Sequence, residues 1–153
     1  MRMLITVLAG LTLAAATACA EPAPDKPANP AATAEAGDIQ AACAAVMTAR
    51  KTALDALAPV SATLAQETPS ATDLAKATQA LRTIFSAMHV DVAAAAEHTS
   101  DTRFKEKITA YQFSIEQAIV AVEGADDDKT KLTNAMELPS MRDAEQAIMT
   151  ACA

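Results

Sequence analysis

The sequence predicts an all-α protein: an up-down-up-down four-helix bundle whose last helix is broken near Pro139 and which one disulfide closes. Alanine, the best helix former, is the most frequent residue, whereas glycine occurs only three times and aromatic residues make up 3% of the chain. Apolar residues recur at helical spacing in four successive stretches. The connections between these stretches are short, which favours antiparallel neighbours and therefore a simple bundle.

The first helix is expected over residues 39–66, with a kink or a split at Pro59. The second is expected over residues 71–98, where Ser70 and Asp73 form an acidic variant of the capping box. Apolar side chains at helical spacing give each of these helices one face to bury. They are Ile39, Cys43, Val46, Met47, Leu54, Leu57, Val60 and Leu64 in the first, and Leu74, Ala77, Leu81, Ile84, Phe85, Met88, Val92 and Ala95 in the second.

The third helix is expected over residues 101–123, with Gly124 as the residue that ends it in the left-handed conformation. The acidic run 126–128 then favours the start of a fourth helix, because carboxylates interact well with a helix N-terminus. Leu138–Pro139 interrupts this helix, since the residue before proline avoids the helical region. Ser140 is expected to cap the last piece.

Residues 1–18 are typical of a secretion signal peptide, with a positive Arg2, an apolar run over residues 3–16 and small residues before Cys19. Ala16-Thr17-Ala18-Cys19 resembles a bacterial lipobox, in which the cysteine becomes the first mature residue and carries the lipid. It departs from that pattern in having Ala16 where leucine is usual. We expect a secreted lipoprotein with a palmitate-type membrane anchor on Cys19. Cleavage by an ordinary signal peptidase, without acylation, remains open.

The expected organisation after the signal is a lipidated Cys19 and a tether rich in proline and alanine over residues 19–37, followed by the bundle domain over residues 38–153. The chain from Cys19 onward carries 11 basic and 19 acidic residues, a net charge of −8. This charge argues against nucleic-acid binding and against adhesion to anionic lipid. Membrane contact is therefore expected through the lipid on Cys19 alone, and a monomer is expected.

The three cysteines are expected to have two different roles. With Cys19 acylated, Cys43 and Cys152 remain as an even pair in an oxidising compartment. An up-down-up-down topology places both at the same end of the bundle, so a disulfide between them is expected. The alternative is a pair of free buried thiols.

This order of features resembles that of small secreted lipoproteins of actinobacteria. The matching pieces are the lipobox at residues 16–19, the spacer at 20–37, Cys43 one turn into the first helix and Cys152 near the C-terminus. The resemblance implies extracytoplasmic placement and a helical fold. It implies no activity, because the group carries none that is assigned.

No catalytic constellation stands out, so no enzyme activity, cofactor or metal site is expected. The three glycines exclude a glycine-rich phosphate loop, and the zinc-protease, nucleophile-elbow and paired-cysteine motifs are missing from the sequence. His89 and Tyr111 are the side chains to consider as haem or metal ligands. The other interpretation of His89 is a histidine at the edge of the core with one side of its ring in water.

Two further features have a structural and a functional interpretation. Arg50 and Asp91 interrupt apolar stripes at similar heights, which suggests a partly buried ion pair, or an Arg50 whose head reaches solvent. Phe113 and Val120 lie off the main stripe of the third helix. They form a candidate surface for a protein partner if exposed, or extra core if the bundle is wide.

The leading functional hypothesis is a non-enzymatic cell-envelope lipoprotein that acts as a binding module for an unknown partner. One alternative is a carrier of a small ligand or haem inside the bundle. Another is an inhibitor of a secreted enzyme, by analogy at the level of the fold with disulfide-bearing four-helix inhibitors.

Overall fold

A computed structural model describes the backbone of residues 30–153 and the side chains from Asp38 onward. Its elements, in chain order, are α1 (Pro30–Leu64), α2 (Ala71–Ala95), the short 3-10 helix η1 (Ala96–His98), α3 (Thr102–Glu123), α4 (Lys129–Met136) and α5 (Pro139–Ala151). The predicted all-α class is confirmed for this part of the chain. The predicted signal peptide, Cys19 and the first part of the tether lie outside the described residues.

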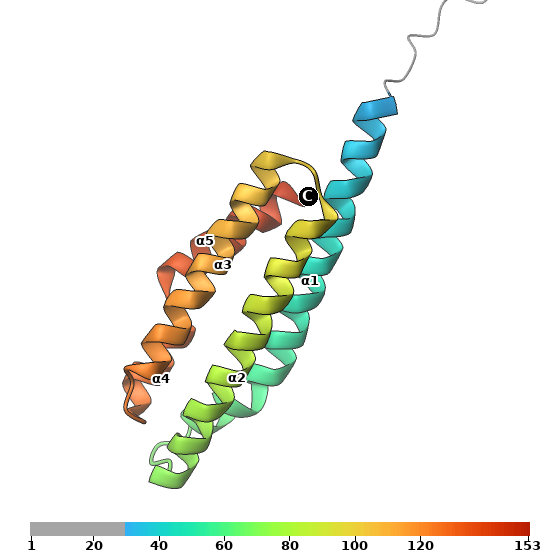
Figure 1. Cartoon of the computed structure of the whole chain (residues 1–153). Coiled ribbons are helices and arrows are strands. Elements are labelled where there is room, and N and C mark those ends of the chain that lie inside the picture. The colour runs from blue at the N-terminus through green and yellow to red at the C-terminus, as the bar shows by residue number, and fades with distance from the viewer. Residues whose placement is uncertain (1–29) are drawn as a thin grey trace, which may run out of the picture.

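The helices form the predicted up-down-up-down bundle, in which α4 and α5 together make the fourth antiparallel element (Figure 1). The most extensive packing joins α1 to α2, α2 to α3, and α3 to α5. The N-terminal part of α1 projects beyond the other helices, at the end of the bundle where the C-terminus also lies (Figure 1). A tether would therefore leave the domain from that end.

Polar contacts fix the register between neighbouring helices. Between α2 and the end of α3, Thr78 Oγ1 donates to Asp127 Oδ1 at 2.6 Å, and Arg82 pairs with Glu123 at 3.7 Å. A step of four residues forward along α2, from Thr78 to Arg82, therefore corresponds to a step of four residues backward in sequence, from Asp127 to Glu123. By the same step, Val90 of α2 lies level with Ile115 of α3.

Side chains cap the starts of α2, α3 and α4, and the cap of α2 is the one that the sequence predicted. The Ser70 hydroxyl accepts from the Asp73 backbone N–H at 3.2 Å and donates to the Asp73 carboxylate at 2.7 Å, which is the predicted cap of α2. The Asp101 carboxylate accepts from Phe104 N–H, and the Asp128 carboxylate accepts from Lys131 N–H. Each of these side chains satisfies an N–H that has no partner inside its helix.

The turn after α3 differs from the expectation. Gly124 ends the helix with a φ of −85°, so it does not take the left-handed conformation. Asp126 and Asp127 take it instead, with φ of 51° and 56°. Asp128 N–H donates to Ala125 C=O at 2.9 Å, and this closes a four-residue turn with two consecutive left-handed residues.

Helix α1 is longer than predicted and is not split. It begins at Pro30, eight residues before the expected domain boundary. Alanine dominates the segment from 31 to 36, and proline is well suited to a first helical position, so the helix extends into the segment predicted as extended tether. It also runs through Pro59 to Leu64, because the buried Val60 and Leu64 hold its last turn on the core.

The start of α5 corrects another detail. Leu138 takes the N-cap position without a side-chain hydrogen bond, and Pro139 is the first helical residue, so Ser140 is not the cap. The Ser140 hydroxyl donates instead to Gln117 Oε1 of α3 at 2.7 Å. The predicted break near Pro139 is confirmed, since α4 ends at Met136 and α5 begins at Pro139.

The core lies along the bundle axis and combines a few large side chains with many alanines. The α1 face that it uses is built from small residues, among them the buried Ala42, Ala49 and Ala53. The largest fully buried side chains are Tyr111, Phe85, Leu81, Ile108, Ile115, Leu132 and Ile148. Alanine buries little area, so each large side chain carries a large share of the hydrophobic stabilisation.

Candidate functional site

The side of the bundle where α1 faces α4 and α5 is held by three contacts, and we call this line of contact the α1–α5 seam. Cys43 and Cys152 form the predicted disulfide, with their Cα atoms 5.7 Å apart. Arg50 pairs with Glu145, and Lys129 Nζ donates to the backbone carbonyl of Gln66. These contacts bind the two ends of the seam and leave its middle open.

The predicted Arg50–Asp91 pair is wrong, because Arg50 makes its ion pair with Glu145 of α5. Arg50 follows Cys43 by two helical turns, so it lies on the face of α1 that carries the disulfide and looks toward α5. Asp91 belongs to α2, on the far side of α1, and is exposed. The side chains of Arg50 and Glu145 keep 31% and 29% of their surface in solvent, so this is a half-buried pair.

Tyr111 is fully buried, with 1% of its surface exposed. Burial raises the pKa of its phenol well above the ordinary value, and the Glu145 carboxylate raises it further, while the Arg50 guanidinium partly offsets both. Its electrostatic partners belong to α1 and α5, so its hydroxyl lies near the seam. It is a neutral hydroxyl at any physiological pH.

His89 and Tyr111, the side chains considered as haem ligands, are not brought together. His89 is half-buried and follows Arg82 by two turns on α2. It therefore shares the flank on which Arg82 contacts Glu123 of α3. Tyr111 faces the opposite way, toward Arg50 and Glu145. Among the described residues, no three His, Cys, Asp or Glu side chains gather closely enough to hold a metal ion.

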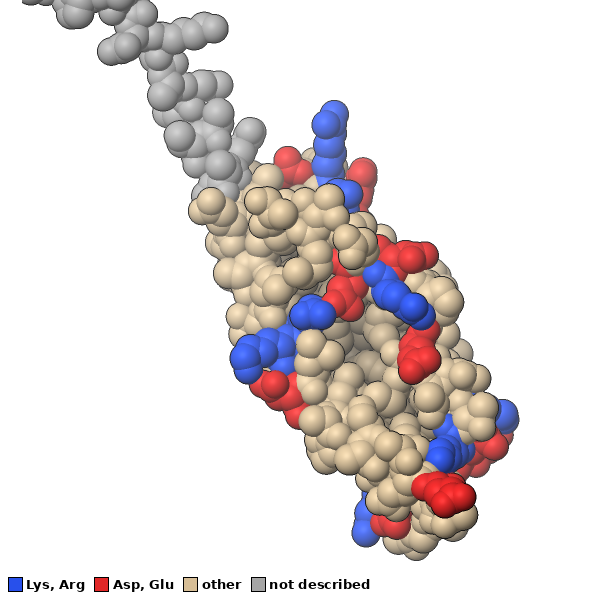
Figure 2. Space-filling view, turned by 180° about the vertical axis from the view of Figure 1, so that it is seen from behind, with Lys and Arg blue, Asp and Glu red and all other residues tan. Residues whose placement is uncertain are grey.

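The middle of the α1–α5 seam is hollowed at the break between α4 and α5. One hollow of about 380 Å³ is lined by Met136, Glu137, Leu138, Met141, Arg142 and Glu145, and we call it the break hollow. A second of about 290 Å³ shares Met136 and Glu137 with it and reaches Leu64 of α1. Figure 2 shows this side, where charged side chains of both signs surround a depression in an uncharged surface. The lining of the break hollow is mostly polar, with Glu137, Arg142 and Glu145 among its residues, whereas the second hollow has a mainly apolar lining.

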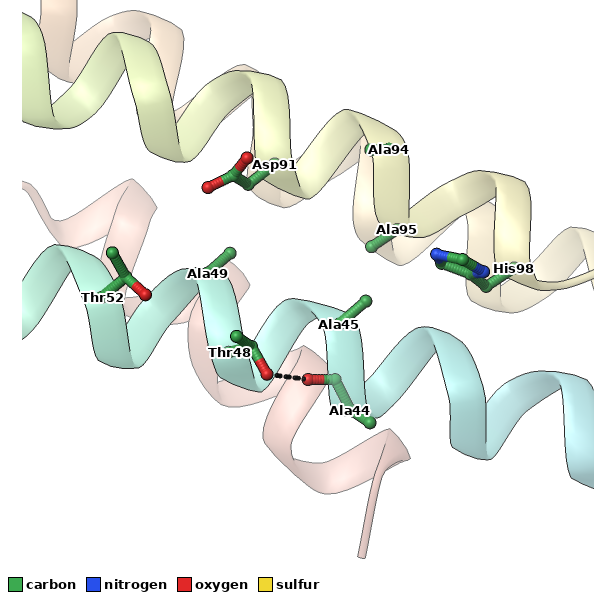
Figure 3. Close-up of a pocket in the computed structure, with 9 residues that line it drawn as sticks. All are labelled: Ala44, Ala45, Thr48, Ala49, Thr52, Asp91, Ala94, Ala95 and His98. Carbon is green, nitrogen blue, oxygen red and sulfur yellow. Dashed lines mark hydrogen bonds between the residues drawn. The ribbon is translucent and has the colours of Figure 1, made fainter.

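A shallow groove of about 430 Å³ runs between α1 and α2 (Figure 3). Its walls are alanines, with Thr48 and Thr52 on one side and Asp91 and His98 on the other. The Thr48 hydroxyl donates to the backbone carbonyl of Ala44 at 2.8 Å, so its proton is already used. Asp91 and His98 stand two helical turns apart, which is too far for one to act on the other as a catalytic pair.

Three large apolar side chains stand out from the α2–α3 side of the bundle, and we call them the outer patch: Val90, Phe113 and Val120. They expose 64%, 59% and 62% of their surface. Phe113 and Val120 are two turns apart on the face of α3 that points away from the core. Val90 is level with Ile115, so along the bundle axis it lies between those two positions, on the neighbouring helix. Of the two interpretations of Phe113 and Val120, the structure supports exposure and contradicts burial as extra core.

From residue 30 onward, no helix combines the length and the apolarity that crossing a bilayer requires. Comparison of the chain with protein-family models, with curated proteins and with solved structures finds no significant match. The functional argument therefore depends on the geometry of the outer patch and of the seam.

Proposed function

We propose that this protein is a non-enzymatic, lipid-anchored lipoprotein of the cell envelope that binds a protein partner through the outer patch. The exposure of Phe113, Val90 and Val120 on two adjacent helices is the observation that supports the proposal. A folded monomer gains nothing from presenting a phenylalanine to water, whereas an aromatic residue is a common anchor of a protein interface.

The surroundings of the outer patch suit a protein interface. The α2 side chains beside it are uncharged: Ser86, Ala87 and Ala93. Helices α2 and α3 are packed together over most of their length and present the patch on a rigid support. Such preorganisation reduces the entropy lost on binding.

The anchor part of the proposal depends on the N-terminal sequence. A diacylglycerol and an amide-linked chain on Cys19 would give stable attachment, which a single acyl chain does not. The tether would join the domain at the free end of α1, so the outer patch would face sideways, along the membrane surface. An inhibitor of a secreted enzyme is one form of this proposal, since it also acts by binding a protein.

The anchor is tested by Cys19→Ser in the producing cell. We expect the wild-type chain in the detergent-soluble envelope fraction with the mass of added acyl chains, and the variant without that mass in the aqueous fraction. An unacylated wild-type chain in the medium would contradict the anchor.

Binding is tested by replacing Phe113 with the photoreactive analogue p-benzoylphenylalanine and irradiating intact cells. The matched control carries the same analogue at Leu54, which is 48% exposed on α1. We expect a protein adduct from position 113 that is lost when Val120→Ser is added, and no adduct from position 54. Equal labelling from both positions would refute a specific interface.

The second hollow supports a second candidate, a carrier of a small apolar ligand, because its lining is mainly apolar. Its volume of about 290 Å³ is close to the smallest ligand pockets, and Met136 adapts readily in shape. An apolar fluorescent probe should gain intensity with the wild type and lose most of that gain with Met136→Glu. A gain that is unchanged by the substitution would remove this candidate.

A further inference from the structure

We infer that the break hollow and the second hollow form one site for a free α-amino acid with an apolar side chain. The inference rests on the second candidate of the proposed function, the carrier of a small ligand, and names the class of that ligand. Met136 and Glu137 line both hollows, so the two adjoin each other at the end of α4. Their linings differ in chemistry, and this difference selects the ligand.

The second hollow suits the side chain of the ligand. Its lining is mainly apolar, with Leu64, Ala65 and Met136 among its residues. Burial of an apolar side chain there is favoured by the hydrophobic effect. The volumes of the two hollows, about 290 and 380 Å³, are small for ligand pockets, so they favour a molecule with a short side chain over a long-chain lipid.

The break hollow offers the head of such a molecule one charged group of each sign. Its Glu145 is already paired with Arg50, whereas Glu137 and Arg142 are exposed and make no ion pair with another described residue. These two residues are close together, because Arg142 Nη2 donates to the backbone carbonyl of Glu137 at 3.2 Å. The ammonium and the carboxylate of an α-amino acid are separated by a single carbon atom, so one molecule can contact both charged side chains.

The start of α5 adds to the place for the carboxylate. Leu138 occupies the N-cap position without a side-chain hydrogen bond, and no acidic residue lies in the first turn. Backbone N–H groups at a helix start interact favourably with an anion. Leu138 and Arg142 both line the break hollow, so a carboxylate bound to Arg142 would also lie near this helix start. The ammonium is then left to Glu137.

Other small ligands use these features less completely. A purely apolar molecule would occupy the second hollow and leave Glu137 and Arg142 without partners. An apolar molecule with a single charge would satisfy one of them and meet the other as a like charge. A zwitterion with one apolar side chain uses the apolar lining, the guanidinium and the carboxylate together.

The test is a titration of the full chain carrying Cys19→Ser and ¹³C-methyl methionine with L-leucine, followed by NMR. The methyl signal of Met136 is identified by its loss in Met136→Leu. We expect this signal to shift to saturation. The signal of Met149, which is exposed near the far end of α5, should stay in place.

Two truncated probes separate the contributions of the head. Leucinamide lacks the carboxylate, and 4-methylpentanoate lacks the ammonium. Each should bind about tenfold more weakly than L-leucine, because each loses a hydrogen bond between charged groups. Equal affinities for all three compounds would overturn the inference.

Single substitutions assign the two charges. Arg142→Gln should weaken L-leucine about tenfold and leave leucinamide unchanged, whereas Glu137→Gln should weaken L-leucine and leave 4-methylpentanoate unchanged. The matched control is Arg103→Gln, which removes an exposed arginine from the first turn of α3 and should change neither affinity. An affinity for L-leucine that Arg142→Gln does not lower would contradict the site.

These outcomes are distinguishable from a failure of the second candidate. Binding of the apolar probe that Met136→Glu removes, without any shift caused by L-leucine, supports the carrier and overturns the amino acid as its ligand. Saturable binding of L-leucine that depends on Glu137 and Arg142 supports both. A chain that binds neither the apolar probe nor L-leucine overturns both.

Discussion

Removal of the Cys43–Cys152 disulfide should cost this domain much of its stability. The two cysteines are 109 positions apart, so the bond closes a loop that contains nearly the whole described fold. The chain-entropy relation gives about 5 kcal/mol for a loop of this length at room temperature. A domain of this size has a total free energy of unfolding of about 5–15 kcal/mol.

The structure explains why the loss should be felt so strongly. Besides the disulfide, only the half-buried Arg50–Glu145 pair and the exposed Lys129–Gln66 hydrogen bond join the two sides of the α1–α5 seam by polar contacts among the described residues. The α1 face is made largely of alanine, whose packing contributes little per residue. Without the bond, α5 should separate from α1 first.

The test is urea unfolding of the double variant Cys43→Ala/Cys152→Ala, followed by circular dichroism. We expect a loss of about 4–5 kcal/mol and a fall in melting temperature of roughly 15–20 °C. Wild type with a reducing agent is the matched control and should behave like the variant. A loss below about 1 kcal/mol in both samples would refute the loop-closure reasoning.

Three further predictions concern single sites. In a double-mutant cycle, Arg50→Ala and Glu145→Ala should show a coupling of about 0.5–1 kcal/mol, as expected for a half-exposed pair, and additive losses would contradict the contact. Asp126→Gly should raise the free energy of unfolding by about 0.5 kcal/mol, because glycine adopts the φ of 51° without strain and only an exposed pair with Lys131 at 3.8 Å is lost. Asp127→Gly should gain less, because it loses the hydrogen bond from Thr78, and urea midpoints measure both. Tyr111 is the only tyrosine, so absorbance at about 295 nm reports its ionisation directly. The raised pKa of its phenol gives stability that is complete below about pH 10 and is lost as the pH rises above it, so phenolate should appear only with unfolding.

Periodicity and turn chemistry predicted the helices well, because each helix has one apolar face and a recognisable start. The cap at Ser70 and the break at Pro139 follow from local rules that no neighbouring helix overrides. The early start of α1 did not follow. Four prolines within residues 20–37 suggested an extended chain, although Pro30 can also open a helix through the alanines behind it.

The partner of Arg50 was predicted wrongly because the prediction compared the positions of Arg50 and Asp91 along the bundle axis. It did not consider toward which neighbouring helix the Arg50 face of α1 points. The missing signal is in the spacing. Arg50 follows Cys43 by seven residues, and Glu145 precedes Cys152 by seven, so in an antiparallel pair joined by the disulfide these two charges must meet. The break hollow could not be predicted this way, since it depends on how α4, α5 and the two residues between them are placed in space.

The outer patch offers a direct separation of function from stability, because the domain does not use it to fold. Phe113 exposes more than half of its surface and points away from the core. Phe113→Ser should therefore change the free energy of unfolding by less than about 0.5 kcal/mol, the usual range for surface positions. Phe104→Ser is the matched variant on the same helix, and since Phe104 is buried it should lose about 3–5 kcal/mol. Urea midpoints measure both, and a loss above about 1 kcal/mol at Phe113 would mean that the patch supports the fold and has no need of a partner.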